Sequence, residues 1–134
     1  MEAYPMPMFV KLGVADMGRS LAWYRKLGFR SVFELPAGEG NTVMAHIRAG
    51  RYQDIMLVAG KGAAPKGEGV MLNFTVADVD AFAARAGGII EGPTDRPWNA
   101  RELVLEDPDG YKLTLSAGID PEKGFDEVVE QFKA

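Results

Sequence analysis

The residues that could perform chemistry in this chain are few, and their types limit that chemistry. The 134 residues include a single histidine, His46, and no cysteine. These counts exclude thiol catalysis, zinc–thiolate and iron–sulfur sites, and any metal site built mainly on imidazole within one chain. A hard metal would have to rest on carboxylates, for which Asp54, Glu102 and Glu106 are the candidates.

Trp98 indicates binding rather than catalysis. It lies in a proline-flanked loop and is followed closely by Arg101 and Glu102. An aromatic face can stack on flat ligand rings and offers a large contact area at low entropic cost. We favour a place for Trp98 in a pocket, and packing at the edge of the core is the alternative.

An internal repeat indicates which elements must position these residues. The segment Leu12–Met17 is similar to Phe74–Val79, and Ile55–Gly60 is similar to Leu113–Gly118. Two matched landmarks in the same order imply two copies of one unit of about 55 residues. The hydrophobic runs and turn residues of each copy predict a strand, a helix and three further strands.

The boundaries of these elements follow from caps, apolar periods and turn residues. Asp16 and Asp78 are expected to cap the two helices, which end at Gly28 and, after about Ala86, at the pair Gly87-Gly88. The carboxylates of Asp107 and Asp109 belong to a predicted turn and are not interpreted as an acid–base pair. The predicted strands are Phe9–Val14, Arg30–Leu35, Thr42–Arg48, Asp54–Val58 and Val70–Val76, with others near Ile89, Leu103 and Leu113, and the first hairpin turn is placed at Pro36–Gly40.

The chain is therefore expected to be a single α+β domain over residues 1–134. Module one is placed at about 7–60, a linker at about 61–69, and module two at about 70–117. Each βαβββ module forms a cupped mixed sheet with its helix on the outer face. A C-terminal amphipathic helix at about 121–132 is expected to dock on the body or on a partner chain.

Alternation along the strands separates a helix-facing side from an opposite side that mixes apolar and polar residues. That composition suits a concave binding pocket. Phe33 could equally be a core residue, the default for His46 is a structural histidine, and Phe9, Met56 and Met71 could fill a closed core. We favour the cleft, with these ligand-binding candidates: Trp98, Phe33, Phe9, Met44, His46, Met56, Met71, Asn73, Glu102 and Thr114.

The overall composition narrows the partners further. Hydrophobic residues make up 47% and charged residues 25% of the chain, and the formal net charge is −4. Lys and Arg are scattered, which argues against nucleic-acid binding. No apolar run is long enough to span a membrane, and the absence of cysteine is consistent with a cytoplasmic location.

The sequence resembles the glyoxalase / bleomycin-resistance / extradiol-dioxygenase (vicinal oxygen chelate) superfamily over about residues 7–117. The resemblance is carried by the paired modules, by Val-Ala-Asp at the start of each helix, by Ser20–Phe29 and by Asp107–Gly110. Residues 97–108 and 28–33 are most similar to the bleomycin-resistance proteins. That resemblance implies a homodimer that holds an unaltered antibiotic in clefts between subunits, with Trp98 and Phe33 stacking on its rings and with Glu102, and also Glu34, available to its cationic groups.

The resemblance also implies where a metal would bind if the chain were one of the superfamily's enzymes. The ligand positions correspond to Phe9, Met56, Met71 and Thr114, none of which suits a hard metal. We therefore expect no metal, no cofactor and no catalytic residue. In the leading hypothesis, the protein sequesters an aromatic, DNA-damaging antibiotic for self-resistance. The alternatives are a lyase or dioxygenase that uses shifted ligands or no metal, and a structural domain with a vestigial cleft.

Overall fold

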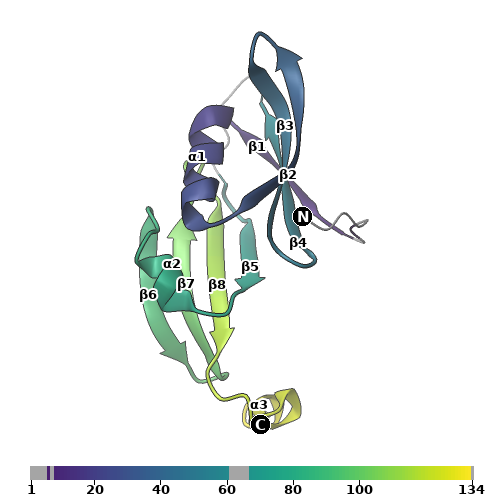
Figure 1. Ribbon diagram of the computed structural model, residues 1–134. Coiled ribbons are helices and arrows are strands. Elements are labelled where there is room, and N and C mark those ends of the chain that lie inside the picture. The colour runs from purple at the N-terminus through teal and green to yellow at the C-terminus, as the bar shows by residue number, and fades with distance from the viewer. Residues whose placement is uncertain (1–5, 7, 61–66, 134) are drawn as a thin grey trace.

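The computed structural model describes residue 6 and residues 8–60 and 67–133. Module one forms a four-stranded mixed sheet, sheet one, in the order β1-β4-β3-β2 (Figure 1). Strand β1 runs parallel to β4, and the other neighbours are antiparallel. The elements of module one are β1 (Val10–Val14), α1 (Met17–Leu27), β2 (Arg30–Gly38), β3 (Asn41–Gly50) and β4 (Gln53–Ala59).

Module two repeats this arrangement in sheet two, whose order is β5-β8-β7-β6. The repeat and the α+β class predicted from the sequence are confirmed. In each module the first strand pairs in parallel with the last. The described part of the predicted linker is limited to residues 67–69, since residues 61–66 lie outside the described residues. The elements of module two are β5 (Met71–Thr75), α2 (Val79–Ala83), β6 (Ile89–Arg96), β7 (Ala100–Glu106) and β8 (Lys112–Gly118), followed by α3 (Phe125–Glu130).

Both helices begin at the predicted caps. The carboxylate of Asp16 accepts a hydrogen bond from the Arg19 amide at 3.0 Å, and Asp78 accepts from the Ala81 amide at 3.2 Å. Helix α1 ends at Gly28, whose φ of 120° favours glycine. Helix α2 is shorter than predicted, because it ends at Ala83 and the chain then turns toward β6.

The turn predicted at Pro36–Gly40 is wrong in its extent. Strand β2 continues to Gly38, β3 begins at Asn41, and only Glu39 and Gly40 form the turn, with φ values of 52° and 77°. A two-residue turn with positive φ matches the right-handed twist of the paired strands. Pro36 is accepted within β2 because β2 is an edge strand of sheet one.

One continuous apolar core joins the two modules. Helix α1 covers one face of sheet one and buries Tyr24 and Leu27 against it. The rings of Tyr24, Phe29 and Phe74 follow one another edge to face, with centroids 5.2 Å apart at each step, and carry the core from α1 into module two. The buried strand residues include nine that alternation assigns to the helix side: Leu12, Val14, Ile55, Leu57, Phe74, Leu103, Leu105, Leu113 and Leu115.

Two reciprocal hydrogen bonds also hold the modules together. The Tyr111 hydroxyl donates to the Gly13 carbonyl at 2.9 Å, and the Gln53 side-chain amide donates to the Thr75 carbonyl at 2.9 Å. By the offsets of the internal repeat, Tyr111 matches Gln53 and Thr75 matches Gly13. Each module therefore donates a side-chain hydrogen bond to the equivalent backbone carbonyl of the other module.

The turn at Asp107–Gly110 makes a buried polar cluster with α1. The Asp107 carboxylate accepts from the Tyr24 hydroxyl at 2.7 Å and from the amides of Asp109 and Tyr111, both at 2.9 Å. The Asp109 carboxylate accepts from the Ala15 amide at 3.0 Å and from the Ser20 hydroxyl at 3.2 Å. Burial raises the pKa of Asp107, and burial beside Asp107 raises the pKa of Tyr24, so the phenol keeps its proton. These aspartates are turn formers, as predicted.

Helix α3 is shorter than the predicted 121–132 and has no buried residue. It does not dock on the body of its own chain as an apolar face would, because Phe125 is 80% exposed and Phe132 is 56% exposed. Its side-chain hydrogen bond to the body runs from the Gln131 amide to the Pro97 carbonyl, beside Trp98. No helix in the described part of the chain is long and apolar enough to cross a membrane.

Candidate functional site

The face of sheet one opposite α1 carries one continuous row of side chains, one from each strand. Partners in the sheet register share a face, and Met56 pairs with both its neighbours in this row. The residues of the row, in order from β2 to β1, are Phe33, His46, Met56 and Lys11. We call the side of sheet one that carries them the open face of sheet one.

A β-bulge near the start of β2 is needed to place Phe33 on this face. Arg30 pairs with Arg48 and Phe33 pairs with His46, so the strand holds one residue more than its partner between these pairs. Because of this bulge, Arg30 and Phe33 lie on the same face although they are three residues apart. The Phe33 ring is 57% exposed, so it is not a core residue in this chain.

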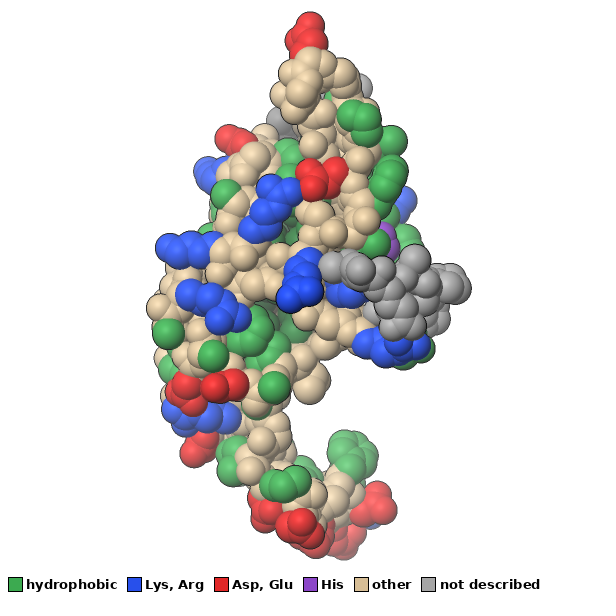
Figure 2. All heavy atoms as spheres, viewed as in Figure 1, with side chains coloured by type: hydrophobic (Ala, Val, Ile, Leu, Met, Phe, Trp, Pro, Cys, Tyr) green, Lys and Arg blue, Asp and Glu red, His purple; other side chains and the backbone are tan. Residues whose placement is uncertain are grey.

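The open face of sheet one is mostly apolar. The next row consists of Leu35, Met44 and Val58, and Phe9 lies just before β1. Leu35 and Phe9 are 41% and 39% exposed. Figure 2 shows the single histidine in purple beside green hydrophobic side chains at one edge of the molecule. Exposed aromatic rings beside half-buried methionines suit contact with an apolar ligand or with another chain.

His46 is held in place by a buried ion pair. The Asp54 carboxylate accepts from Arg48 through Nε at 2.7 Å and Nη2 at 2.8 Å, and it lies 2.7 Å from Nε2 of His46. The Phe9 ring stacks on the imidazole, with centroids 6.0 Å apart and 23° between the planes. His46 is therefore positioned from two sides, and its ring lies on the open face of sheet one.

Acid should weaken the contribution of Asp54 to stability. Burial by itself raises the pKa of Asp54, but hydrogen bonds from Arg48 and His46 outweigh it and lower that pKa below its usual 3.8. The stabilisation is thus complete above pH 3.8 and is lost as the pH falls through the lower folded-state pKa. The gap in unfolding free energy between the native chain and Asp54→Asn, measured by urea unfolding from about pH 7 to about pH 2, should shrink only in strong acid. A gap that stays constant down to the lowest pH would contradict this.

The open face of sheet two differs in character from that of sheet one. Its residues are mostly polar, and two rows cross the sheet from β5 to β6. Met71 and Asn73, at the β5 edge, are exposed. Hydroxyl and amide groups predominate, which suits hydrogen bonds to the substituents of a ligand. The rows are Asn73, Thr114, Val104 and Glu91, and Thr75, Ser116, Glu102 and Thr94.

Trp98 lies at the hairpin between β6 and β7, and its indole is fixed by a carboxylate. Its Nε1 donates to Glu102 at 3.0 Å, while Arg96 contacts the same carboxylate at 3.3 Å and Glu91 at 2.7 Å. The Arg96 guanidinium lies 5.9 Å from the indole ring. Trp98 stays 44% exposed, so it can offer its ring to a ligand.

The expectation that Glu102 and Glu34 meet cationic ligand groups needs correction. Glu102 contacts Arg96, a cation that it shares with Glu91, and it accepts a hydrogen bond from the indole of Trp98. Glu34 pairs with Arg25 of α1 at 2.7 Å, so it faces the helix side of sheet one and away from the open face. Sequence reasoning missed Arg96, because its contact with Glu102 depends on the register of the β6–β7 hairpin.

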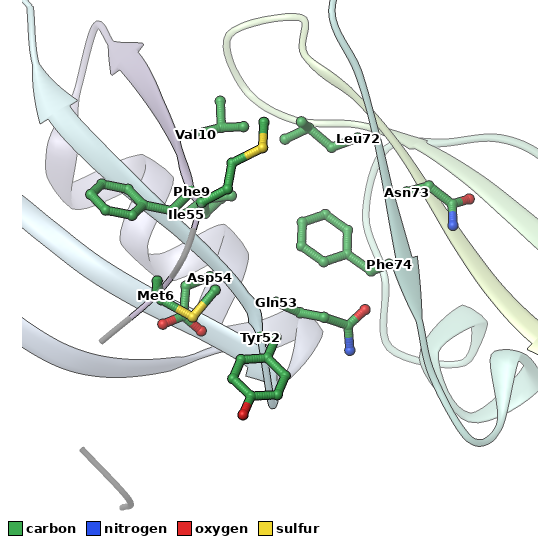
Figure 3. A pocket seen from close by; sticks show the side chains of 11 residues that line it. Met6, Phe9, Val10, Tyr52, Gln53, Asp54, Ile55, Leu72, Asn73 and Phe74 are labelled. Carbon is green, nitrogen blue, oxygen red and sulfur yellow. The ribbon is translucent and has the colours of Figure 1, made fainter. Parts of the chain in front are cut away.

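In the described part of the chain, the two open faces lie on different sheets. A pocket of about 320 Å³ lies at the module junction, where Leu72 and Phe74 face Val10 and Ile55 (Figure 3). Of the predicted ligand-binding residues it includes only Phe9 and Asn73. The remaining candidates divide between the faces: Phe33, Met44, His46 and Met56 on sheet one, and Met71, Trp98, Glu102 and Thr114 on sheet two.

The described residues contain no group of three or more His, Cys, Asp or Glu side chains that could hold a metal ion. The three carboxylates considered for a shifted metal site are each paired with a cation. Asp54 binds Arg48, Glu102 contacts Arg96, and Glu106 lies 3.0 Å from Lys112. Metal binding at any of them would have to compete with an existing ion pair.

Comparison with known proteins relates this architecture to a large family. The model of the "Glyoxalase/Bleomycin resistance protein/Dioxygenase superfamily" matches residues 8–115. No curated protein matches the chain.

Several solved structures share the fold. TioX from Micromonospora sp. ML1 is 26% identical, with a TM-score of 0.68 over 83% of this chain and 94% of that one. TnmS3, described as an antibiotic binding protein from Streptomyces sp. CB03234, is 25% identical, with a TM-score of 0.66 over 88% and 98%. A bleomycin-binding protein complexed with bleomycin is 22% identical, with a TM-score of 0.63 over 85% and 99%, and shows the shared fold.

Proposed function

Because the chain belongs to the Glyoxalase/Bleomycin resistance protein/Dioxygenase superfamily, we propose that it binds a flat aromatic antibiotic and sequesters it without altering it. The antibiotic is proposed to be a DNA-damaging one against which the host protects itself. The observation that carries the proposal is the apolar open face of sheet one, where exposed Phe33 and Phe9 surround the fixed His46. A flat ring system gains contact area there without a change in the fold.

The ligand is proposed to bind between two copies of the chain. Sheet one supplies an apolar face and sheet two supplies a polar face with Trp98, but the two faces lie on different modules. A homodimer that sets module one of one protomer opposite module two of its partner would join them. The two-fold symmetry of such a dimer would create two equivalent clefts.

The side chains at the positions of the superfamily's metal ligands favour sequestration without chemistry. The positions at which the superfamily's enzymes hold a metal correspond to Phe9, Met56, Met71 and Thr114. The sequence likeness to TnmS3, described as an antibiotic binding protein, supports the same reading. We also propose a cytoplasmic location, since a chain without cysteine suits a reducing compartment.

The test is thermal unfolding of chelator-treated protein with bleomycin, doxorubicin and actinomycin D. A ligand at about 100 times its dissociation constant should add about 2.7 kcal/mol to the unfolding free energy. We expect a shift with at least one antibiotic without added metal, and mass spectrometry should recover that antibiotic unchanged. A shift that appears only after a divalent metal is returned, or an altered product, would favour a lyase or dioxygenase instead.

A further inference from the structure

The free ring nitrogen of His46 offers a specific polar contact on an otherwise apolar face. Its Nε2 lies 2.7 Å from a carboxylate oxygen of Asp54. An ionised carboxylate only accepts hydrogen bonds, so Nε2 carries a proton and donates it. The other nitrogen, Nδ1, then has a lone pair in the neutral ring and a proton in the imidazolium.

This Nδ1 is open to a ligand. Among the described residues it has no hydrogen-bond partner, and no buried side-chain nitrogen or oxygen in that part of the chain lacks one. Nδ1 is therefore in contact with solvent on the open face of sheet one. The ring cannot readily turn away, because Asp54 is itself fixed by two hydrogen bonds from Arg48 and Phe9 stacks on the imidazole.

The charges around His46 favour a ligand that is neutral or anionic. Lys11 of β1 lies in the same row, with Met56 between it and His46, and no carboxylate in the described part of the chain pairs with it. Arg30 of β2 is exposed in the adjoining row. Asp54 of β4 is the one acid described on this face, and Arg48 of β3 neutralises it. Each strand thus contributes one charged residue to this face, and the net charge of the four residues is positive.

We propose that His46 and Lys11 select a flat aromatic ligand that carries an acidic hydroxyl group, a phenol or an enol. This inference rests on the proposed function and names the ligand class for the same site. The ligand hydroxyl donates its hydrogen bond to Nδ1 of the neutral ring. If the proton transfers, the ligand O–H bond breaks, a new N–H bond forms at Nδ1, and the resulting oxyanion lies near imidazolium and Lys11. A cationic amine on the ligand would instead meet like charges.

The probes are 2-hydroxyanthraquinone and 2-methoxyanthraquinone, which have the same rings and differ only in the acidic proton. A hydrogen bond of ordinary strength predicts that the native chain binds the hydroxy compound about tenfold more tightly than the methoxy compound. Transfer of the proton would also shift the visible absorption of the bound hydroxy compound toward that of its anion. Both are read in one spectrophotometric titration.

The variants separate hydrogen bonding from stacking. His46→Phe keeps a ring beside Phe9 and should bind both probes equally, with the affinity for the methoxy compound retained. His46→Gln supplies an amide that can donate to Asp54 and accept from the ligand, so it should restore part of the preference. Lys26→Gln, at an exposed position of α1 away from the open face of sheet one, is the control and should keep the full preference. Thermal unfolding checks that each variant is folded.

Three outcomes distinguish the hypotheses. Equal binding of both probes by the native chain would overturn the role of His46 and leave the proposed function standing. If His46→Phe still binds the hydroxy compound more tightly than the methoxy compound, the role of His46 is likewise overturned and the proposed function stands. If the native chain binds neither probe, the inference fails, and the thermal unfolding test with the three antibiotics decides the proposed function separately.

Discussion

Two variants that each bind a ligand weakly are expected to regain tight binding when they are unfolded and refolded together. Trp98→Ala removes the exposed indole from sheet two, and Phe33→Ala removes the exposed ring from sheet one. Buried aromatic anchors typically contribute about 2 kcal/mol or more to a complex, so each homodimer should lose about thirtyfold or more in affinity. The ligand is the antibiotic that gives the largest thermal shift.

The restoration follows from a cleft shared between copies. In a mixed dimer one cleft has both rings and the other has neither. After equal amounts are unfolded and refolded together, about a quarter of all clefts should regain native affinity, as statistical pairing of the two chains requires. Mixing without refolding is the control. A cleft confined to one chain would gain nothing from the mixture, and that result would reject the shared site.

Replacing Asp107 with alanine is expected to have the largest effect on stability. Its carboxylate accepts from Tyr24 and from two backbone amides, all of them buried. A buried donor without an acceptor costs about 1–3 kcal/mol, so three of them should cost about 3 kcal/mol or more. Tyr24→Phe removes one donor and leaves a charged acceptor, which should cost about 2 kcal/mol.

Chemical unfolding of both variants measures these costs. Asp126→Ala, on the exposed helix α3, is the matched aspartate control and should unfold like the native chain. The order of stability should be native, then Tyr24→Phe, then Asp107→Ala. An Asp107→Ala chain as stable as the native one would show that the cluster does not hold α1 to module two.

Much of the fold was predictable because it depends on local signals. The caps Asp16 and Asp78 and the turn at Asp107–Gly110 are chosen by short-range hydrogen bonding, which the residue types reveal. Strand alternation placed the core residues correctly, since a period of two leaves only two faces to choose between. The internal repeat then supplied the order of elements in both modules.

The contacts between distant segments were not predictable from these signals. Alternation shows that Glu102 faces away from the core, but it does not show that Arg96 and Trp98 bind it, because that depends on the register of the β6–β7 hairpin. The bulge before Phe33 breaks the period of two and could not be placed from residue types alone. The division of the candidate site between two sheets depends on how the modules pack, which no local pattern records.

The reciprocal hydrogen bonds between the modules bear on which positions of the chain tolerate substitution. The hydrogen bond from Gln53 to Thr75 and the one from Tyr111 to Gly13 join equivalent positions of the two modules. They are therefore reciprocal, like the contacts of an isologous interface between identical subunits. The architecture is that of a pair of half-length units with the same strand order and different sequences. Only the second half carries the Asp107 and Asp109 carboxylates at its turn. Sequence drift should therefore be tolerated more readily at the turn around Gly50 than at its counterpart around Pro108.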